Sequence, residues 1–364
     1  MGMHIQEFVI HDYKGLHELK LNDLNSINIL TGDNNSGKTS VLELLYTLDN
    51  PQNTGSWVLG SRMRSVSPRS RYYFNGFFNM FPVDSDTKIV SYDYKDCRGR
   101  VNNISMHAKI NEMQILETEM YQLEGLRVTK PKKSEDELLD TVCMHLTTYL
   151  NGDIINEDEI YDFQNRISKF ISKNKSFVRV TYVSPVDHFF GQLFLNDVLS
   201  DLAMHEELIR VLQEFDKNIV SVNALRNESS PYSSEYMILT KNHKKALPLN
   251  AYGDGMKKTL LLLSAVVRSQ NGILLLDEFE TAIHTSVMDA VFDCLLKSAL
   301  KLNVQVFMTS HSKEAIEKVL TTQEKLQDYI NLYTLYDFEG KNYVRRMNCK
   351  EAVHAQKNLG LELR

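Results

Sequence analysis

The sequence predicts an α/β protein built around a largely parallel sheet, and two patterns carry this prediction. Residues Ser26–Leu48 run in the order strand, glycine-rich loop, helix. From Gly253 onward the chain alternates apolar helices with short buried strands. Such alternation is typical of parallel sheets whose strands are joined by helices. The length of 364 residues, 43% of them hydrophobic, allows one large domain or two modest ones.

The first part of the chain predicts strands. Residues Met3–His11 alternate apolar and polar side chains, as a half-buried strand does. A turn at Tyr13-Lys14-Gly15 follows, then short strands at Leu19–Leu21 and Ser26–Leu30 and a helix at Thr39–Leu48. Turn residues then separate three apolar runs that predict an antiparallel meander, at Lys88–Tyr94, Val101–Ile110 and Ile115–Leu123.

The middle of the chain predicts mainly helices. We expect helices at Glu135–Tyr149, Glu157–Lys173 and Leu195–Phe215, with one strand at Phe177–Val183. A helix from Met256 then leads to the strand Ile273–Leu276, and the helix Val287–Leu302 leads to the strand Val304–Thr309. The resulting division has three parts: residues 1–128, a mainly helical part at 129–235, and residues 236–364.

Composition limits the environment and the partners. The net charge of −6 argues against a general polyanion binder, so any nucleic-acid contact requires a local basic patch. The longest apolar run, Thr259–Val267, is far shorter than the roughly 20 residues that span a bilayer. The start of the chain has no features of a signal peptide. Four scattered cysteines in no metal-ligand pattern fit a reduced cytoplasmic compartment: Cys97, Cys143, Cys294 and Cys349.

The strongest motif is a complete G-x4-G-K-T sequence between the predicted strand and helix. Its glycines let backbone N–H groups point at phosphates beside a helix N-terminus. Lys38 is expected to reach the β- and γ-phosphates of ATP, and the Thr39 hydroxyl to bind Mg²⁺. The expected nucleotide contacts are Gly32, Asn34, Asn35, Ser36, Gly37, Lys38, Thr39 and Ser40.

Two acids and a histidine follow two of the buried strands. Asp277 and Glu278 end the run Ile273–Leu276, where carboxylates emerge at the sheet edge. Asp277 is expected to hold Mg²⁺, and Glu278 to orient and deprotonate the attacking water. His311 follows the next strand, which we expect beside the Asp277 strand. His311 would then act near the γ-phosphate, although a satisfied core histidine is the simpler interpretation of this residue alone.

A second glycine-rich segment begins the helix that precedes Asp277. Gly253, Asp254 and Gly255 at a helix N-terminus can bind an anion. Because the first loop already binds phosphates, this second segment predicts a nucleotide shared between two subunits. A plain helix-entry turn is the alternative.

Together these motifs resemble the ABC/SMC superclass of ATPases, and within it the RecF-like and overcoming-lysogenization-defect (OLD) ATPases. The segment from Gly253 to Lys258 matches the subgroup's signature, Asp277 to His284 its acidic motif, and Thr309 to Ser312 its histidine loop. The resemblance implies an ABC-type P-loop ATPase head with a helical insertion lobe at 129–235. It also implies that Thr281–His284 lies at a dimer seam, and that Tyr13 or Lys14 matches a weakly defined nucleotide contact.

The chain departs from its relatives in several places. Transporter ATPases have serine where this chain has Gly253, so backbone amides and Lys257 or Lys258 would have to compensate. No glutamine loop is identifiable. The segment after His311 is too short for the Toprim nuclease domain of OLD nucleases, and no long helical arm like that of SMC proteins is predicted.

A basic stretch and an aromatic cluster remain open to two interpretations. The arginines are either a solvated loop or a contact for nucleic acid or an acidic partner: Arg62, Arg64, Arg69 and Arg71. The aromatic residues are either packing or base-stacking groups: Tyr72, Tyr73, Phe74, Phe77, Phe78 and Phe81.

The resulting hypothesis is a cytoplasmic Mg²⁺-dependent ATPase that forms a homodimer or a higher oligomer around ATP. It would regulate a separately encoded effector, a nuclease or toxin, in bacterial anti-phage defence. One alternative is a RecF-like DNA-binding repair factor, and another is an ATP-bound scaffold with negligible turnover.

Overall fold

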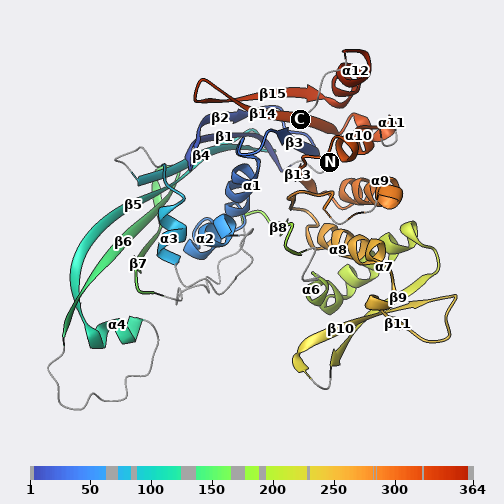
Figure 1. Ribbon diagram of the computed structural model, residues 1–364, viewed down its shortest axis with the longest axis horizontal. Helices are drawn as coiled ribbons and strands as arrows, with labels where there is room; N and C mark the ends of the chain where they lie inside the picture. Colours follow the sequence, from blue (N-terminus) through green and yellow to red (C-terminus); the bar gives the residue numbers. More distant parts are fainter. Residues whose placement is uncertain are drawn as a thin grey trace.

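A computed structural model describes most of the chain (Figure 1). The described residues are 4–62, 73–82, 88–123, 137–164, 177–187, 194–227, 230–281, 283, 285–321 and 324–359. The arginines at 64, 69 and 71, the aromatic Tyr72 and His284 lie outside them, and the side chain of Arg62 is also not described. Within the described residues, no helix is long and apolar enough to cross a membrane.

A largely parallel sheet forms the centre of the molecule. Its strand order is β15-β14-β3-β13-β12-β8, and every neighbouring pair except the antiparallel β14–β15 is parallel. The strands β3, β8, β12 and β13 are buried on both faces, which explains their continuous apolar runs. Their bounds are β3 Ile27–Gly32, β8 Val180–Val183, β12 Ile273–Leu276, β13 Gln305–Thr309, β14 Ile330–Phe338 and β15 Lys341–Asn348.

A second, antiparallel sheet packs against one face of the first. Its order is β2-β1-β4-β5-β6-β7, so the predicted meander is confirmed and continues farther along the chain than expected. Figure 1 shows β5, β6 and β7 curving away to one side of the molecule. The strands are β1 Ile5–Tyr13, β2 Leu16–Leu21, β4 Lys88–Asp96, β5 Val101–Leu116, β6 Leu138–Leu150 and β7 Asp153–Tyr161.

The parallel sheet divides the interior into two hydrophobic cores, which the helices complete. Leu274 and Leu276 of β12 face a core shared with α6 to α10, whereas Ile273 and Leu275 face a core shared with α1 and the antiparallel sheet. The parallel sheet is therefore the middle layer. The helices are α1 Lys38–Thr47, α2 Thr54–Arg62, α3 Tyr73–Phe78, α4 Glu117–Leu123, α6 Leu195–Ser200, α7 Leu202–Phe215, α8 Asp254–Arg268, α9 Thr285–Lys301, α10 Lys313–Thr321, α11 Glu324–Gln327 and α12 Cys349–Leu359.

A small third sheet lies beside α7. It has the order β11-β10-β9, with bounds β9 Ile219–Asn227, β10 Ser230–Thr240 and β11 Leu247–Pro248, and the short 3-10 helix Leu249–Ala251 follows it. In Figure 1 this sheet lies at the side of the molecule opposite the β5–β7 strands.

The helical prediction for part of the middle segment is wrong. Residues expected as the helix Glu135–Tyr149 form β6, and the expected helix from Glu157 begins within β7. In β6 the buried Met144, Leu146 and Thr148 alternate with more exposed side chains, so the true period is two. The charged side chains of β7 favoured a helix in sequence, but they suit an edge strand.

Three smaller boundaries also differ from the prediction. The expected strand Ile115–Leu123 is the end of β5 followed by α4. The expected helix Leu195–Phe215 is two helices, because Asp201 caps α7 by accepting a hydrogen bond from the Met204 N–H. The three-part division of the chain stays a prediction.

Candidate functional site

The loop between β3 and α1 is shaped by two glycines that no other residue can replace without strain. Gly32 has φ 134° and Gly37, which caps α1, has φ 92°, both left-handed values that favour glycine. A Cβ atom at Gly32 would lie 2.0 Å from the Leu335 carbonyl oxygen, and one at Gly37 would lie 2.4 Å from Leu16 Cδ2. The motif glycines therefore fix the loop by close packing as well as by conformation.

The Lys38 side chain is held inside this loop. It is only 5% exposed, and its Nζ donates hydrogen bonds to the Gly32 oxygen at 2.9 Å and the Asp33 oxygen at 2.7 Å. Of the other predicted contacts, Asn34 and Asn35 are exposed at the tip of the loop. The loop thus places an ammonium group directly beneath exposed backbone at the N-terminus of α1.

Asp277 joins four elements at the carboxyl edge of the parallel sheet. It is fully buried and follows β12 directly. Its carboxylate accepts hydrogen bonds from Thr309 Oγ1 at 2.6 Å, Tyr182 OH at 2.9 Å and Thr39 Oγ1 at 3.4 Å. The predicted pair Thr39 and Asp277 is therefore brought together, and three hydroxyl groups donate to one carboxylate.

Glu278 turns away from the strand that Asp277 ends. Its φ of 49° is left-handed, which is uncommon for a residue with a side chain. Its backbone N–H donates to Thr309 Oγ1 at 2.8 Å, and the next N–H, of Phe279, donates to the Thr309 carbonyl at 3.2 Å. Thr309 thus holds both acids in place, and it leaves the Glu278 side chain partly exposed while Asp277 is enclosed.

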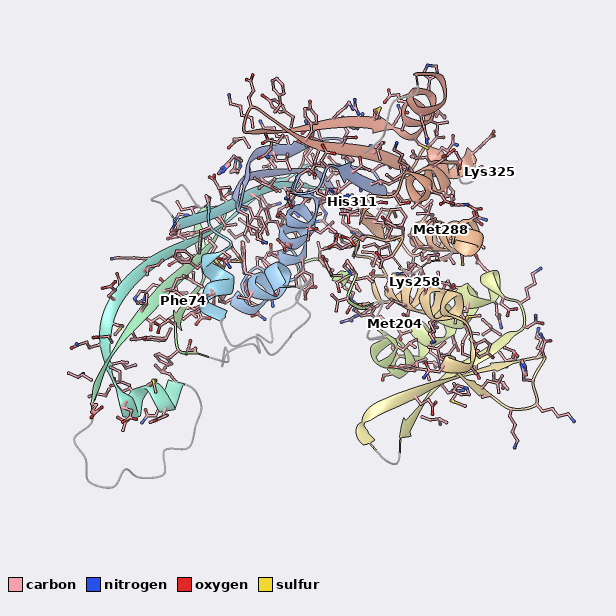
Figure 2. All side chains as sticks on the ribbon, in the orientation of Figure 1. Phe74, Met204, Lys258, Met288, His311 and Lys325 are labelled. Atoms are coloured by element: carbon pink, nitrogen blue, oxygen red, sulfur yellow. The ribbon has the colours of Figure 1, made fainter. Side chains whose placement is uncertain are left out.

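The strand that precedes Asp277 and Glu278 and the strand that precedes His311 are neighbours in the sheet, as predicted. β12 and β13 pair in parallel, with Leu276 opposite Met308, and β13 lies between β12 and β3. His311 lies beyond the carboxyl end of β13, in the central part of the molecule (Figure 2). This edge therefore gathers the motif residues of three adjacent strands.

Glu280 connects the acidic turn to the histidine loop. Its Oε1 accepts hydrogen bonds from the backbone N–H groups of His311 at 3.1 Å and Ser312 at 3.2 Å. Its other oxygen, Oε2, is buried and has no hydrogen-bond partner within the described residues. The sequence resemblance included Glu280 in a motif without giving it a role, and the structure shows it as the backbone tether of the histidine loop.

Lys258 does not face the surface as its position in the glycine-rich segment suggested. Its side chain is 4% exposed, and its Nζ donates to the Thr281 carbonyl oxygen. Burial lowers its pKa to about 6, partly offset by the Glu280 carboxylate, which raises it. Of the two lysines expected to compensate for the missing serine, Lys258 has its ammonium group directed into the protein, so the expectation stays with the backbone amides and the half-buried Lys257.

The start of α8 has an open environment. Gly253 is exposed, caps the helix without a side-chain hydrogen bond, and has no atom within 4 Å of a Cβ built on it. Gly255 is half-buried, and its carbonyl accepts from Thr259 Oγ1 at 2.7 Å. The side chain of Asp254 is outside the description. The exposed Gly253 thus places the start of this 15-residue helix at the protein surface.

A buried carboxylate lies one helical turn beyond Thr39, and the sequence did not single it out. Glu43 is on the same side of α1 as Thr39, since residues four apart share a helix face. It accepts hydrogen bonds from Tyr13 OH at 2.9 Å and Lys14 Nζ at 2.5 Å. Burial raises the pKa of Glu43, and the charge of nearby Asp277 raises it further, while Lys14 and Tyr13 lower it.

Comparison with known families agrees with the geometry. The pattern described as "AAA ATPase domain" matches residues 3–188, about half of the chain. The chain belongs to this family. A second pattern, described as "AAA domain, putative AbiEii toxin, Type IV TA system", matches residues 151–317 of the AAA ATPase chain.

Two curated relatives span most of this AAA ATPase. An "ATP/GTP phosphatase" of Helicobacter pylori is 26% identical over 344 residues, covering 86% of each chain. A "DNA replication and repair protein RecF" of Francisella tularensis is 22% identical over 358 residues, covering 88% of this chain and 98% of the relative.

Solved structures confirm the fold. The SMC head domain from Thermotoga maritima has a TM-score of 0.51 at 12% identity, covering 95% of this chain and 100% of that one. An SMC head solved with the C-winged helix domain of ScpA has a TM-score of 0.50 at 12% identity, covering 96% and 99%. The protein is thus an ATP-hydrolysing enzyme, and it shares its fold with the SMC head domains.

Proposed function

We propose that this enzyme hydrolyses Mg²⁺-bound ATP at the carboxyl edge of its parallel sheet, in a site completed by a second subunit. The observation that carries the proposal is the meeting of Thr39, which follows Lys38 at the start of α1, with Asp277, since Thr39 Oγ1 lies 3.4 Å from the Asp277 carboxylate. Thr39 and Asp277 are 238 residues apart in the sequence, and ordinary packing does not require them to meet.

The triphosphate would bind across the loop from Gly32 to Lys38. Backbone N–H groups at the N-terminus of α1 and the positive end of its dipole favour the phosphate charge. The Lys38 ammonium would exchange its loop carbonyl partners for phosphate oxygens, which form stronger charge-assisted hydrogen bonds. Ser36 and Ser40, which flank Lys38 in the sequence, would offer hydroxyl groups to the phosphates.

The oxygen set fits magnesium. A hydroxyl from Thr39 and a carboxylate from Asp277 are hard ligands of the kind that Mg²⁺ takes together with phosphates and water. The bound ion would neutralise charge that develops on the β- and γ-phosphates. The hydrogen bonds from Tyr182 and Thr309 hold the Asp277 carboxylate in one orientation.

Glu278 is the group we assign to the attacking water. It is next to the metal-binding acid and partly exposed, so its carboxylate can reach a water molecule that Asp277 cannot. His311, whose loop is anchored by Glu280, would contact the γ-phosphate side of the site and sense its charge. General-base assistance of this kind contributes about 10²–10⁴-fold in rate.

The second half of the site would come from another copy of the chain. The first backbone N–H groups of α8, at Gly253, Asp254 and Gly255, would bind the partner's phosphate, since Gly253 is exposed and no atom of its chain lies within 4 Å of a Cβ built on it. A phosphate bound at the loop of one subunit would satisfy them. We further propose that this ATP-dependent pairing regulates a separate effector, a nuclease or toxin, in bacterial anti-phage defence, within the cytoplasm.

The experiment is Glu278→Gln, with Glu339→Gln as the matched control, since Glu339 is exposed and also has a left-handed φ of 52°. Glu278→Gln should keep ATP affinity, lose about 10²–10⁴-fold in turnover, and elute with ATP and Mg²⁺ as a larger particle by light scattering. Turnover equal to that of the control would remove Glu278 as the base.

Subunit mixing tests the shared site separately. Lys38→Ala damages the loop half and Gly253→Trp the helix half, so neither variant alone hydrolyses ATP. An equal mixture forms pairs with one intact composite site, and it should recover about a quarter of the parent activity. A mixture that stays inactive, from variants that both fold, would contradict the shared site.

The RecF relative supports a second candidate, an ATP-dependent DNA-binding function in repair. That candidate expects DNA binding that requires ATP and weakens steeply with salt. Under the defence proposal, the protein should instead capture a protein partner when ATP is bound. DNA binding that requires ATP and weakens steeply with salt would replace the defence proposal with the repair function.

A further inference from the structure

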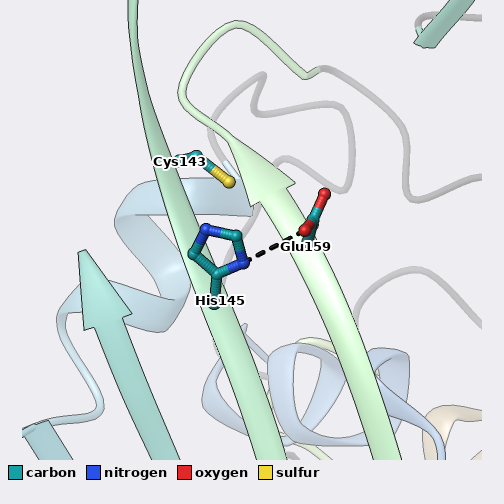
Figure 3. A group of neighbouring side chains, drawn as sticks. All are labelled: Cys143, His145 and Glu159. Carbon is teal, nitrogen blue, oxygen red and sulfur yellow. Dashed lines mark ion pairs between the residues drawn. The ribbon is translucent and has the colours of Figure 1, made fainter. Parts of the chain in front are cut away.

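Three side chains that can bind a metal lie together far along the antiparallel sheet. Cys143 and His145 are on β6, and Glu159 is on the neighbouring strand β7 (Figure 3). Their donor atoms, Sγ, an imidazole nitrogen and a carboxylate oxygen, all lie within 4.8 Å of one another. None of these residues belongs to the nucleotide site.

The sheet geometry places the three donors on one face. Cys143 and His145 are two residues apart on one strand, so they point to the same side. Glu159 is directly opposite His145 in the β6–β7 register. The opposite face of β6 carries the core residues Met144 and Leu146, so the cluster faces outward from the core. Such a triangle can close around an ion with small side-chain rotations.

A hydrogen bond orients one of the donors. Tyr161, opposite Cys143 in the register, donates its OH to Glu159 Oε2 at 3.1 Å, while Oε1 lies 3.1 Å from His145 Nδ1. The Tyr161 ring also stacks on Phe163, with ring centroids 5.4 Å apart. Partners that hold a ligand from behind in this way are typical of metal sites.

We infer that Cys143, His145 and Glu159 bind one Zn²⁺ ion. Thiolate, imidazole and carboxylate together are the ligand types of zinc, and three protein ligands leave a fourth position for water. One thiolate and one carboxylate match the charge of a divalent ion. On the adjacent strand β5, Lys109 and Asn111 face His145 and Cys143 in the register, and neither adds a negative charge.

An ordinary cross-strand ion pair accounts for only part of this arrangement. A largely exposed ion pair such as His145–Glu159 contributes little to stability, and it does not require a fully buried thiol beside it. Binding has a cost, because burial and the Glu159 charge raise the pKa of the Cys143 thiol. The ion must displace that proton, as zinc does at cysteine ligands generally.

The ion would tie β7 to β6 at the edge of the sheet. β7 pairs only with β6 among the described strands, so a bond through Glu159 adds a cross-link where hydrogen bonds come from one side only. The inference does not rest on the ATPase mechanism, since the Asp277 site contains oxygen donors alone.

Co²⁺ replacing Zn²⁺ tests the inference on the full chain, because thiolate binding to Co²⁺ gives a charge-transfer absorption band that oxygen ligands do not. One Co²⁺ per chain should produce the band, and Zn²⁺ should abolish it. Cys143→Ser should eliminate the band, whereas His145→Gln and Glu159→Gln should each weaken binding at least about 10-fold. Cys97→Ser, which alters an exposed cysteine, is the matched control and should change nothing.

The outcomes separate cleanly. Absence of the band, or a band that persists in Cys143→Ser, would overturn the inference. If Cys143→Ser fails to fold by circular dichroism, the partly exposed His145→Gln and exposed Glu159→Gln carry the test through their lowered affinity. ATP turnover should remain at the parent level in these two variants, so failure here leaves the proposed function untouched.

Discussion

The two halves of the proposed nucleotide site are built in opposite ways. In the loop half, Lys38 and Asp277 are enclosed and hydrogen-bonded, and a side chain at Gly32 would collide with the backbone. In the helix half, Gly253 is exposed with open space around it. The loop half is thus preorganised by its own chain. The helix half is available to a ligand that its own chain does not supply.

This difference predicts how substitutions will act. Changes in the loop half should damage folding or nucleotide binding within a single subunit. Changes at the start of α8 should leave the subunit intact and act only after ATP has bound. Four experiments test this contrast.

The largest effect is expected at Asp277. Asp277→Asn keeps the side-chain shape but removes the charge that would bind Mg²⁺, which contributes several kcal/mol to the transition state. Turnover should fall at least about 1,000-fold, measured by phosphate release. Asp289→Asn, an exposed change on α9, is the control. Equal turnover in both variants would show that the carboxylate is not needed.

Lys38→Ala should weaken ATP binding in the isolated subunit. Hydrogen bonds to a charged group are worth about 1.5–3 kcal/mol, so affinity should fall about 10- to 100-fold. Calorimetric titration with ATP measures this change. Lys350→Ala removes an exposed ion pair and should leave affinity unchanged. Parent-level affinity in Lys38→Ala would contradict the role of the loop.

Paired glycine substitutions test the contrast most directly. Gly32→Ala meets both an unfavourable φ and the Leu335 carbonyl, so the free energy of unfolding should fall by about 1–3 kcal/mol. Gly253→Ala has φ −66° and free space, so its effect should stay within about 0.5 kcal/mol. Urea unfolding measures both. Equal losses would remove the distinction between the halves.

The last effect concerns pH and Lys258. Burial lowers its pKa to about 6, whereas lysine in an unfolded chain titrates near about 10.4. Between these values only the unfolded chain binds the proton, so this group makes the free energy of unfolding rise with pH. In Lys258→Met the free energy of unfolding should rise less with pH. The stability of the variant relative to the parent should therefore be highest near about pH 6.

Urea unfolding at several pH values between about 6 and 10 checks this prediction, with Lys257→Met as the neighbouring half-buried control. The same pH dependence in the parent and in Lys258→Met would show that Lys258 titrates alike in the folded and unfolded chains.

The sequence was most informative where function depends on neighbouring residues. The residues from Gly32 to Thr39 are contiguous, and their strand and helix follow from local patterns. The adjacency of β12 and β13 also followed, because one helix connects them. Tyr182 could not be found in this way, since β8 reaches Asp277 only through the folded sheet.

The sequence was least informative in the meander. Strand β7 carries several acidic residues that suggested a helix in the isolated sequence, and only pairing within the sheet decides the outcome. The same region hid the Cys143 cluster. Cys143 and His145 are on β6 and Glu159 is on β7, across the hairpin turn. Their meeting depends on the pairing register of the two strands, which no local sequence pattern specifies.

The left-handed backbone conformation of Glu278 affects what selection for thermal stability would produce in this protein. A side chain in that conformation costs about 1 kcal/mol or more relative to glycine. Glycine at this position would relieve the strain while removing the carboxylate. A search for heat-resistant variants would therefore tend to favour proteins that have lost the carboxylate we assign to the attacking water, so thermal screening of this protein needs an activity assay beside it.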